Sequence, residues 1–371
     1  MPNLAWHLIT GEYPPKPGGI GDYSRLVAEG FACAGHSVHV WTGGTEGTSV
    51  EPSGVIVHRV AGRFHKADLA RLNAEIDKTD RPRRLLIQYV PHSYGFRAMN
   101  VGFCRWVERR RKSGDDVWTM FHEVRVEFRF RDRLDIWITA AVTRWMARHL
   151  LRTSSRVFIA IPAWEQSLAP LKGMAPVLWL PVPSNIPRNN DAAAVQEIRE
   201  HLASGSTTVI GTFGTYSQWI REQLRQVFHL LLDGHPERVV WILGRSGDQF
   251  AAELLAERPD LAGRIVGPGM LSSSETSLHL QGCDILVQPY PDGVSSRRGS
   301  VMAALAHGRT VVSTFGHLTE PFWSETQAIS LAPPGEPRAM AAVVERLLAD
   351  PVTCAAMSRQ AIDLYESRFA V

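Results

Sequence analysis

Short apolar runs rich in β-branched residues recur along the chain, and stretches with helical periodicity separate them. Runs that are apolar on both faces are typical of strands in a parallel sheet, and the intervening helices supply the crossovers that such strands need. This alternation predicts a doubly wound α/β domain in the first half of the chain. The expected strands there are residues 4–10, 36–42, 84–90, 116–122 and 155–161, and the clearest helices are 24–34 and 100–112.

The same pattern starts again after a segment rich in proline and asparagine near residues 176–190. We therefore predict two Rossmann-like doubly wound domains that face each other across a cleft. The second series of expected strands is 208–214, 238–244, 263–269, 284–290 and 309–316, with helices at 219–233 and 300–307. The expected divisions are an N-terminal domain over 1–182, a C-terminal domain over 183–355, and a C-terminal helix over 356–371 for which crossing back to the first domain is an option.

Composition narrows the class of protein. The 371 residues are 44% hydrophobic and 21% charged, as in globular proteins with a sizeable core. No apolar run is long enough to span a bilayer, and the N-terminus has no signal-peptide pattern. The four cysteines are scattered without a CxxC pair, so neither disulfides nor a zinc site is expected. We expect a cytoplasmic protein.

Charge is distributed unevenly between the two halves. Residues 1–180 carry 25 Lys and Arg against 17 Asp and Glu, whereas the remainder carries 15 against 20. Such an asymmetry suggests separate domains with separate partners. Because no nucleic-acid reader motif accompanies the basic half, nucleic acid is not an expected partner.

The sequence PGGIGDY, residues 17–23, stands between the first expected strand and the first expected helix. Glycines there let backbone N–H groups approach a ligand, and a helix N-terminus favours an anion. We expect Gly19 and Gly21 to bind phosphate. The alternative is a tight strand-to-helix turn with nothing bound.

A second loop of this kind lies within residues 283–314, where a buried strand, a polar loop, a helix of small residues and another strand follow one another. Hydroxyl groups, guanidinium groups and free N–H groups at a helix start together form a cradle for a diphosphate. The alternative gives the serines a capping role and leaves the arginines as surface residues. The expected cradle residues are Ser295, Ser296, Arg297, Arg298, Gly299 and Ser300, with Arg221 and Arg245 as further cations.

The layout of residues 283–314 resembles the donor-binding segment of glycosyltransferase family 4. The opening PGGIGDY resembles the N-terminal glycine loop of that family, and His122 resembles its histidine at the cleft edge. The resemblance implies a GT-B fold and a retaining enzyme that uses a nucleotide sugar. The residues of 283–314 in matching places are Pro289, Asp292, Gly293, Ala304, Ala306, Gly308, Val311 and Val312.

One departure from the family pattern concerns two glutamates, which hold the transferred sugar and the ribose of the nucleotide. No glutamate occurs between Cys283 and Thr319; Asp292 replaces the first, and Ala303 stands where the second is expected. We predict a glycosyltransferase whose C-terminal domain holds the donor and whose N-terminal domain holds the acceptor. The alternatives are a nucleotide-sugar epimerase or hydrolase of the same fold, and a non-catalytic accessory homologue.

Stabilising the departing diphosphate is the main electrostatic task in such a transfer. No convincing Asp-x-Asp metal site is found, so arginines and a helix dipole are expected to act without a metal ion, and no cofactor is expected besides the nucleotide-sugar substrate. His122 and Asp292 are the residues expected at the reaction centre. Residues expected to contact the sugar or the acceptor are Asp22, Tyr23, His92 and Glu123.

The acceptor is expected to be a carbohydrate, a lipid-linked molecule or a small molecule. A basic stretch beside two tryptophans suggests peripheral contact with an anionic membrane, and a core helix of the first domain is the alternative. The residues of this stretch are Arg125, Arg129, Arg131, Arg133, Trp137 and Trp145.

Overall fold

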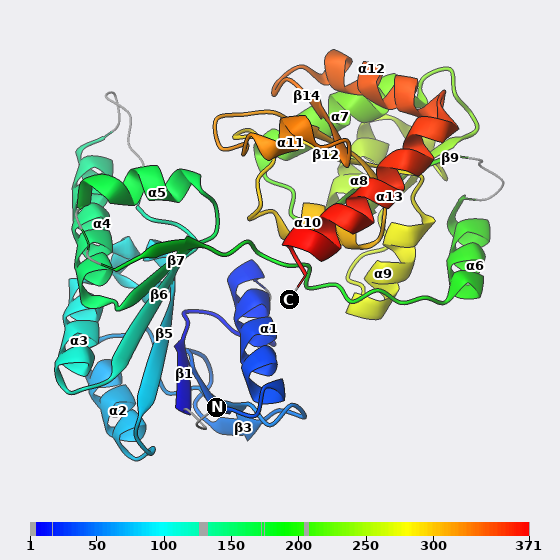
Figure 1. Ribbon diagram of the computed structural model, residues 1–371. Coiled ribbons are helices and arrows are strands. Elements are labelled where there is room, and N and C mark those ends of the chain that lie inside the picture. Colours follow the sequence, from blue (N-terminus) through cyan, green and yellow to red (C-terminus); the bar gives the residue numbers. More distant parts are fainter. Residues whose placement is uncertain are drawn as a thin grey trace. The chain divides into compact units, whose positions relative to one another are not determined.

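Each half of the chain builds its own sheet, as Figure 1 shows. The computed structural model describes residues 5–16, 18–125, 133–171, 173, 175–203 and 208–370. The chain separates into two units, Met1–Pro181 and Val182–Val371. The predicted α/β class and the two parallel-sheet domains are confirmed.

The first unit contains an eight-stranded sheet in the order β3-β4-β2-β1-β5-β6-β7-β8, in which only β3 and β4 pair antiparallel. The strand order reverses beside β1, where doubly wound sheets bind ligands. The strands are β1 (Ala5–Ile9), β2 (Ser37–Trp41), β3 (Thr48–Val50), β4 (Ile56–His58), β5 (Arg83–Tyr89), β6 (Asp116–Phe121), β7 (Arg156–Ile159) and β8 (Val177–Trp179). The helices are α1 (Gly19–Cys33), α2 (Lys66–Asp77), α3 (Val101–Lys112), α4 (Leu134–Thr153) and α5 (Ala163–Leu168), with short 3-10 helices η1 (Pro91–Tyr94), η2 (Phe96–Ala98) and η3 (Ala169–Leu171).

The second unit contains a six-stranded parallel sheet in the order β11-β10-β9-β12-β13-β14. Its strands are β9 (Thr208–Phe213), β10 (Arg238–Leu243), β11 (Ile265–Val266), β12 (Ile285–Gln288), β13 (Thr310–Thr314) and β14 (Ile329–Ala332). Its helices are α6 (Ala192–Ala203), α7 (Gln218–Leu232), α8 (Gly247–Glu257), α9 (Ser273–Gly282), α10 (Gly299–Ala306), α11 (Phe322–Glu325), α12 (Pro337–Leu348) and α13 (Pro351–Arg368), with the 3-10 helix η4 (Pro259–Leu261).

The core of the second unit lies on both faces of its sheet, because neighbouring strand residues point to opposite sides. Val240 and Ile242 of β10 pack with side chains of α7, α8 and α12. Val239 and Trp241 of the same strand pack with side chains of α10 and α13. Burial on both faces explains why these strands appear in the sequence as continuous apolar runs.

All ten strands expected from the sequence are present, although the one expected at 263–269 is reduced to Ile265–Val266. Strands β3, β4, β8 and β14 were not expected; β3, for example, has three exposed residues and no apolar pattern. Helix α13 begins before the predicted residue 356 and contacts α10, α12 and β13 of its own unit. Among the described residues, no helix has both the length and the apolar character needed to cross a membrane.

Candidate functional site

Three loops converge at the carboxyl edge of the second sheet, where ligands bind in doubly wound folds. Gly214 follows β9 and Gly244 follows β10, with positive φ angles of 147° and 100°. A Cβ atom on Gly244 would lie 2.5 Å from the carbonyl oxygen of Gly214, so only glycine fits there. A Cβ atom on Gly214 would lie 3.5 Å from Ser300 Oγ at the start of α10. The loops after β9, β10 and β12 therefore meet at the N-terminus of α10.

The segment of residues 292–300, here called the arginine loop, connects β12 to α10. Asp292 forms ion pairs with both Arg297 and Arg298, so one carboxylate compensates two guanidinium groups. The Arg298 guanidinium also lies over the ring of Tyr290, 4.3 Å from its centre. Tyr290 Oη in turn lies 2.8 Å from Ser300 Oγ. Two guanidinium groups thus share one carboxylate beside the start of a helix.

Glu320 anchors the arginine loop and was missed by the sequence interpretation. Its buried carboxylate accepts hydrogen bonds from the backbone N–H of Ser296, from the Ser296 hydroxyl and, at 2.8 Å, from Trp323 Nε1. The side chains of Ser295 and Ser296 are fully buried. The signal available in the sequence was that Glu320 is the first glutamate after the stretch 283–319, which has none.

The other two predicted cations of the second unit differ from each other. Arg221 lies on α7, where its Nη1 atom is 2.6 Å from Glu253 and its Nε atom donates to the carbonyl oxygen of Tyr216 at 3.0 Å. Arg245 is exposed in the loop after β10 and has no ion pair or hydrogen bond with the residues that the structure describes. Arg245 is therefore available to a ligand, whereas Arg221 is already paired.

The glycine motif of the first unit differs from the expected loop, because Gly19 and Gly21 belong to the first turn of α1. Glu12 Oε1 accepts hydrogen bonds from the N–H groups of Ile20 at 3.1 Å and Gly21 at 3.2 Å. A Cβ atom on Gly18 would lie 2.4 Å from Glu12 Oε1, so glycine makes room for this carboxylate. The chain itself thus supplies an anion at the N-terminus of α1.

His122 lies at the end of β6, next to the first turns of α1. The ring of Tyr23 contacts it edge-on with 4.9 Å between ring centres, and His122 Nε2 is 2.8 Å from Gln88 Oε1 on β5. Burial lowers the pKa of His122 to about 3, so the ring is neutral at ordinary pH. Because Gln88 Oε1 only accepts, the Nε2 atom carries the proton and Nδ1 is left as an acceptor. A neutral, buried ring of low basicity fits a binding role.

The remaining predicted residues of the first unit lie on neighbouring loops. Exposed His92 belongs to η1 after β5, and a Cβ atom on Gly11, after β1, would lie 2.2 Å from the carbonyl oxygen of Ser93. Glu123 follows His122, and Asp22 lies in the first turn of α1. Pro17, Arg129 and Arg131 lie outside the described residues. The loops after β1 and β5 are thus packed together, next to β6, which pairs with β5.

The whole chain is similar in fold to solved glycosyltransferases. A sucrose-phosphate synthase from Thermosynechococcus elongatus is 16% identical with a TM-score of 0.74, and the match covers 99% of this chain and 95% of that one. Anabaena Alr3699/HepE, solved in complex with UDP, is 15% identical with a TM-score of 0.68 over the same shares of the two chains. WaaG, a glycosyltransferase involved in lipopolysaccharide biosynthesis, is 12% identical with a TM-score of 0.67, covering 98% and 95%. The class of fold is therefore GT-B.

A family model narrows this class further. Residues 207–350 match the model of the glycosyl transferases group 1 family, which places a domain of this kind in the second unit. The predicted glycosyltransferase of GT-B fold is confirmed at this level. No curated protein sequence matches the chain.

Proposed function

We propose that the chain transfers a sugar from a nucleoside diphosphate sugar to a hydroxyl group of an acceptor, with retention of the anomeric configuration. The observation that carries this proposal is the convergence of Gly214, Gly244 and Ser300 beside the arginine loop at the start of α10. That arrangement brings close backbone approach, cations and a helix N-terminus to one place. The Anabaena protein in complex with UDP-glucose supports a uridine nucleotide as the first donor to test.

The arginine loop would act on the leaving group. Charge develops on the diphosphate as the bond to the sugar breaks, and preorganised cations stabilise it. Arg297 and Arg298 share Asp292 in the structure, and Arg245 adds a further exposed cation. A diphosphate carries more negative charge than the Asp292 carboxylate, so it pairs better with Arg297 and Arg298. These groups would perform the electrostatic task without a metal ion.

The first unit would bind the acceptor. Gln88 Oε1 fixes the orientation of His122, which leaves Nδ1 as an acceptor for a sugar hydroxyl. Asp22, Tyr23, His92 and Glu123 stay predictions for this side, and Gly19 and Gly21 stay predictions for the donor phosphates. Asp292 would contact the transferred sugar once a diphosphate has taken over its arginines.

The direct test is a calorimetric titration with UDP, ADP and GDP, followed by turnover of the matching nucleotide sugars. We expect micromolar binding of one nucleotide and turnover that survives excess chelator. The anomeric configuration of the product reports retention. Epimerised sugar formed without an acceptor would instead indicate the epimerase, and a chain that binds no nucleotide would indicate the accessory homologue.

We also propose a cytoplasmic location with peripheral membrane contact through α4. Leu134 and Ile138 are 75% and 49% exposed on this helix, and Trp137 and Trp145 are 36% and 39% exposed. Exposed Arg133 lies beside this apolar surface. Sedimentation with anionic and with neutral vesicles tests the proposal, and replacing Leu134 and Ile138 with serine is expected to abolish sedimentation with the anionic ones.

A further inference from the structure

A groove of about 840 Å³ runs between α2 and α3 on the first unit. Its volume lies in the range of small-molecule sites. The groove shares no residue with the candidate site described above. Its apolar lining includes Phe64, Leu69, Phe96, Met99, Val101 and Trp106.

Three cations line the groove without compensation. Lys66, Arg105 and Arg109 are exposed, and their side chains have no ion pair or hydrogen bond with any residue in the described ranges. Arg105 and Arg109 are four residues apart on α3, so their like charges lie on one face and repel each other. An anion between them would relieve this repulsion.

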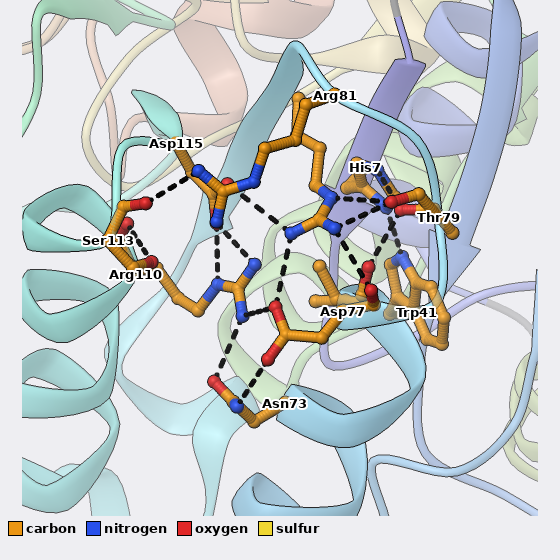
Figure 2. A network of polar contacts seen from close by, with 11 residues as sticks. His7, Trp41, Asn73, Asp77, Thr79, Arg81, Arg110, Ser113 and Asp115 are labelled. Atoms are coloured by element: carbon orange, nitrogen blue, oxygen red, sulfur yellow. Dashed lines mark hydrogen bonds and ion pairs between the residues drawn. The ribbon is translucent and has the colours of Figure 1, made fainter.

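The acidic lining residue, Asp77, does not compensate these cations. Figure 2 shows it in a polar network with Arg110 and Asn73. Asp77, Arg110 and Ser113 line the groove at the C-terminal ends of α2 and α3. The Oδ1 atom of Asp77 lies 2.7 Å from Arg110 Nη1 and 3.1 Å from Arg83 Nη1, and Arg110 Nη1 is also 3.0 Å from Asn73 Oδ1. Arg83 and Arg110 are both buried. The charge left to attract a ligand is therefore positive.

A strained turn lies at the opposite end of the groove. Phe96, Arg97 and Ala98 have positive φ angles of 50°, 51° and 71°, a conformation that non-glycine residues rarely adopt. Asn100 Nδ2 supports the turn by donating to the carbonyl oxygens of Tyr94 and Phe64 at 2.7 and 2.9 Å. The result is a Phe96 ring that is 53% exposed at the groove. Strain of this kind occurs where surrounding structure fixes a functional position.

We propose that the groove binds an anionic amphiphile, a single molecule with a phosphate group on an alkyl chain. Arg105 and Arg109 hold the phosphate, and the chain lies against Leu69, Trp106 and Phe96. The length of the groove agrees with this ligand. Its lining residues run from Lys66 to Asp77 along α2, a helix about 18 Å long, so an extended alkyl chain can lie along it.

The test is calorimetric titration of the full chain with dodecyl phosphate below its micellar concentration. Dodecyl maltoside keeps the alkyl chain without the charge, and inorganic phosphate keeps the charge without the chain. We expect dodecyl phosphate to bind, dodecyl maltoside to bind at least about tenfold more weakly, and inorganic phosphate to show no binding. Arg105→Gln and Arg109→Gln should each weaken dodecyl phosphate binding about tenfold.

Arg111→Gln is the matched control, because Arg111 is exposed on the same helix but does not line the groove. Its affinity should stay within about twofold of the unmodified chain. Phe96→Gly removes the ring and accepts the positive φ, so binding should fall several-fold while the urea midpoint does not fall. Equal weakening by Arg111→Gln, equal binding of dodecyl maltoside, or no binding of dodecyl phosphate would each overturn the proposal. None of these readouts depends on sugar transfer.

Discussion

The N-termini of α1 and α10 occupy comparable places, since each helix follows a parallel strand. They differ in what the nearby carboxylate binds. At α1, the N–H groups of Ile20 and Gly21 already donate to Glu12. At α10, the N-cap residue is Arg298, which makes no side-chain capping bond, and Asp292 pairs with arginines instead of N–H groups. Two glycine-containing helix starts that look alike in a sequence are therefore different sites. At the first, the chain's own carboxylate binds the N–H groups of the helix; at the second, two arginines that share Asp292 stand beside the helix start.

The two units also differ in what keeps their sites intact. The first unit depends on buried neutral rings: burial lowers the pKa values of His7 and His122 to about 3. The second unit depends on the ion pairs of Asp292 and on the hydrogen bonds that Glu320 accepts. Acid and removal of the Glu12 carboxylate act mainly on the first unit. Removal of the arginines beside α10 and removal of the Glu320 carboxylate act on the second.

Acid is expected to have the largest effect, and to act mainly on the first unit. In the unfolded chain His7 and His122 titrate near 6.5, so below that pH the unfolded state binds more protons and stability is lost as pH falls toward 3. At pH 5 this loss is about 2 kcal/mol for each histidine. Hydrogen exchange measured by mass spectrometry at pH 7 and pH 5 should show β1 and β6 losing protection before β9 and β10. Earlier loss in the second unit would contradict the comparison.

Removing the cations beside α10 comes next. The double variant Arg297→Gln with Arg298→Gln should weaken UDP binding at least about 100-fold, because each guanidinium contributes a charge-assisted hydrogen bond of about 1.5–3 kcal/mol. Arg346→Gln is the matched control, since Arg346 is exposed on α12 of the same unit. Calorimetry gives both affinities. An unchanged affinity in the double variant would place the diphosphate elsewhere.

Removing the anchor of the arginine loop should have a smaller effect. Glu320→Gln puts an N–H₂ group where three donors now point at a carboxylate, so we expect a loss of about 2 kcal/mol in the free energy of unfolding. UDP binding should also weaken, because the loop is no longer held through the hydrogen bonds between Ser296 and the Glu320 carboxylate. Urea unfolding and calorimetry measure the two effects, with Glu325→Gln as the control, because the Glu325 side chain of α11 is exposed. Full stability in Glu320→Gln would show that the carboxylate does not hold the loop.

Periodicity was sufficient to predict the fold. Continuous apolar runs identified β9, β10, β12 and β13 because both faces of these strands are buried. Short edge strands such as β3 were not predicted, because three exposed residues carry no apolar pattern. Residue type also identified the arginines of the candidate site, but Gly214 and Gly244 were not among the predicted residues.

The hydrogen-bond partners of individual side chains, by contrast, could not be predicted from residue types. Glu12, Gln88 and Glu320 matter because of the atoms they contact, and those contacts join segments far apart in the sequence. A sequence shows that a helix start contains glycine, but not that a carboxylate from another loop already fills it. The assignment of diphosphate to Gly19 and Gly21 therefore needs its own test.

Removing the cap of α1 provides that test and has the smallest expected effect. Glu12→Gln keeps the shape of the side chain but removes the charge, so the free energy of unfolding should fall by about 0.5–1 kcal/mol. Glu29→Gln on the same helix is the control, because its contact with Arg25 is a long one of 3.9 Å on partly exposed side chains, and it should cost less. Since Glu12 is the anion of this helix start, UDP affinity should stay within about twofold. Tighter UDP binding in Glu12→Gln would mean that the carboxylate and the donor phosphates compete for the N–H groups of α1, and the two helix starts would then be alike after all.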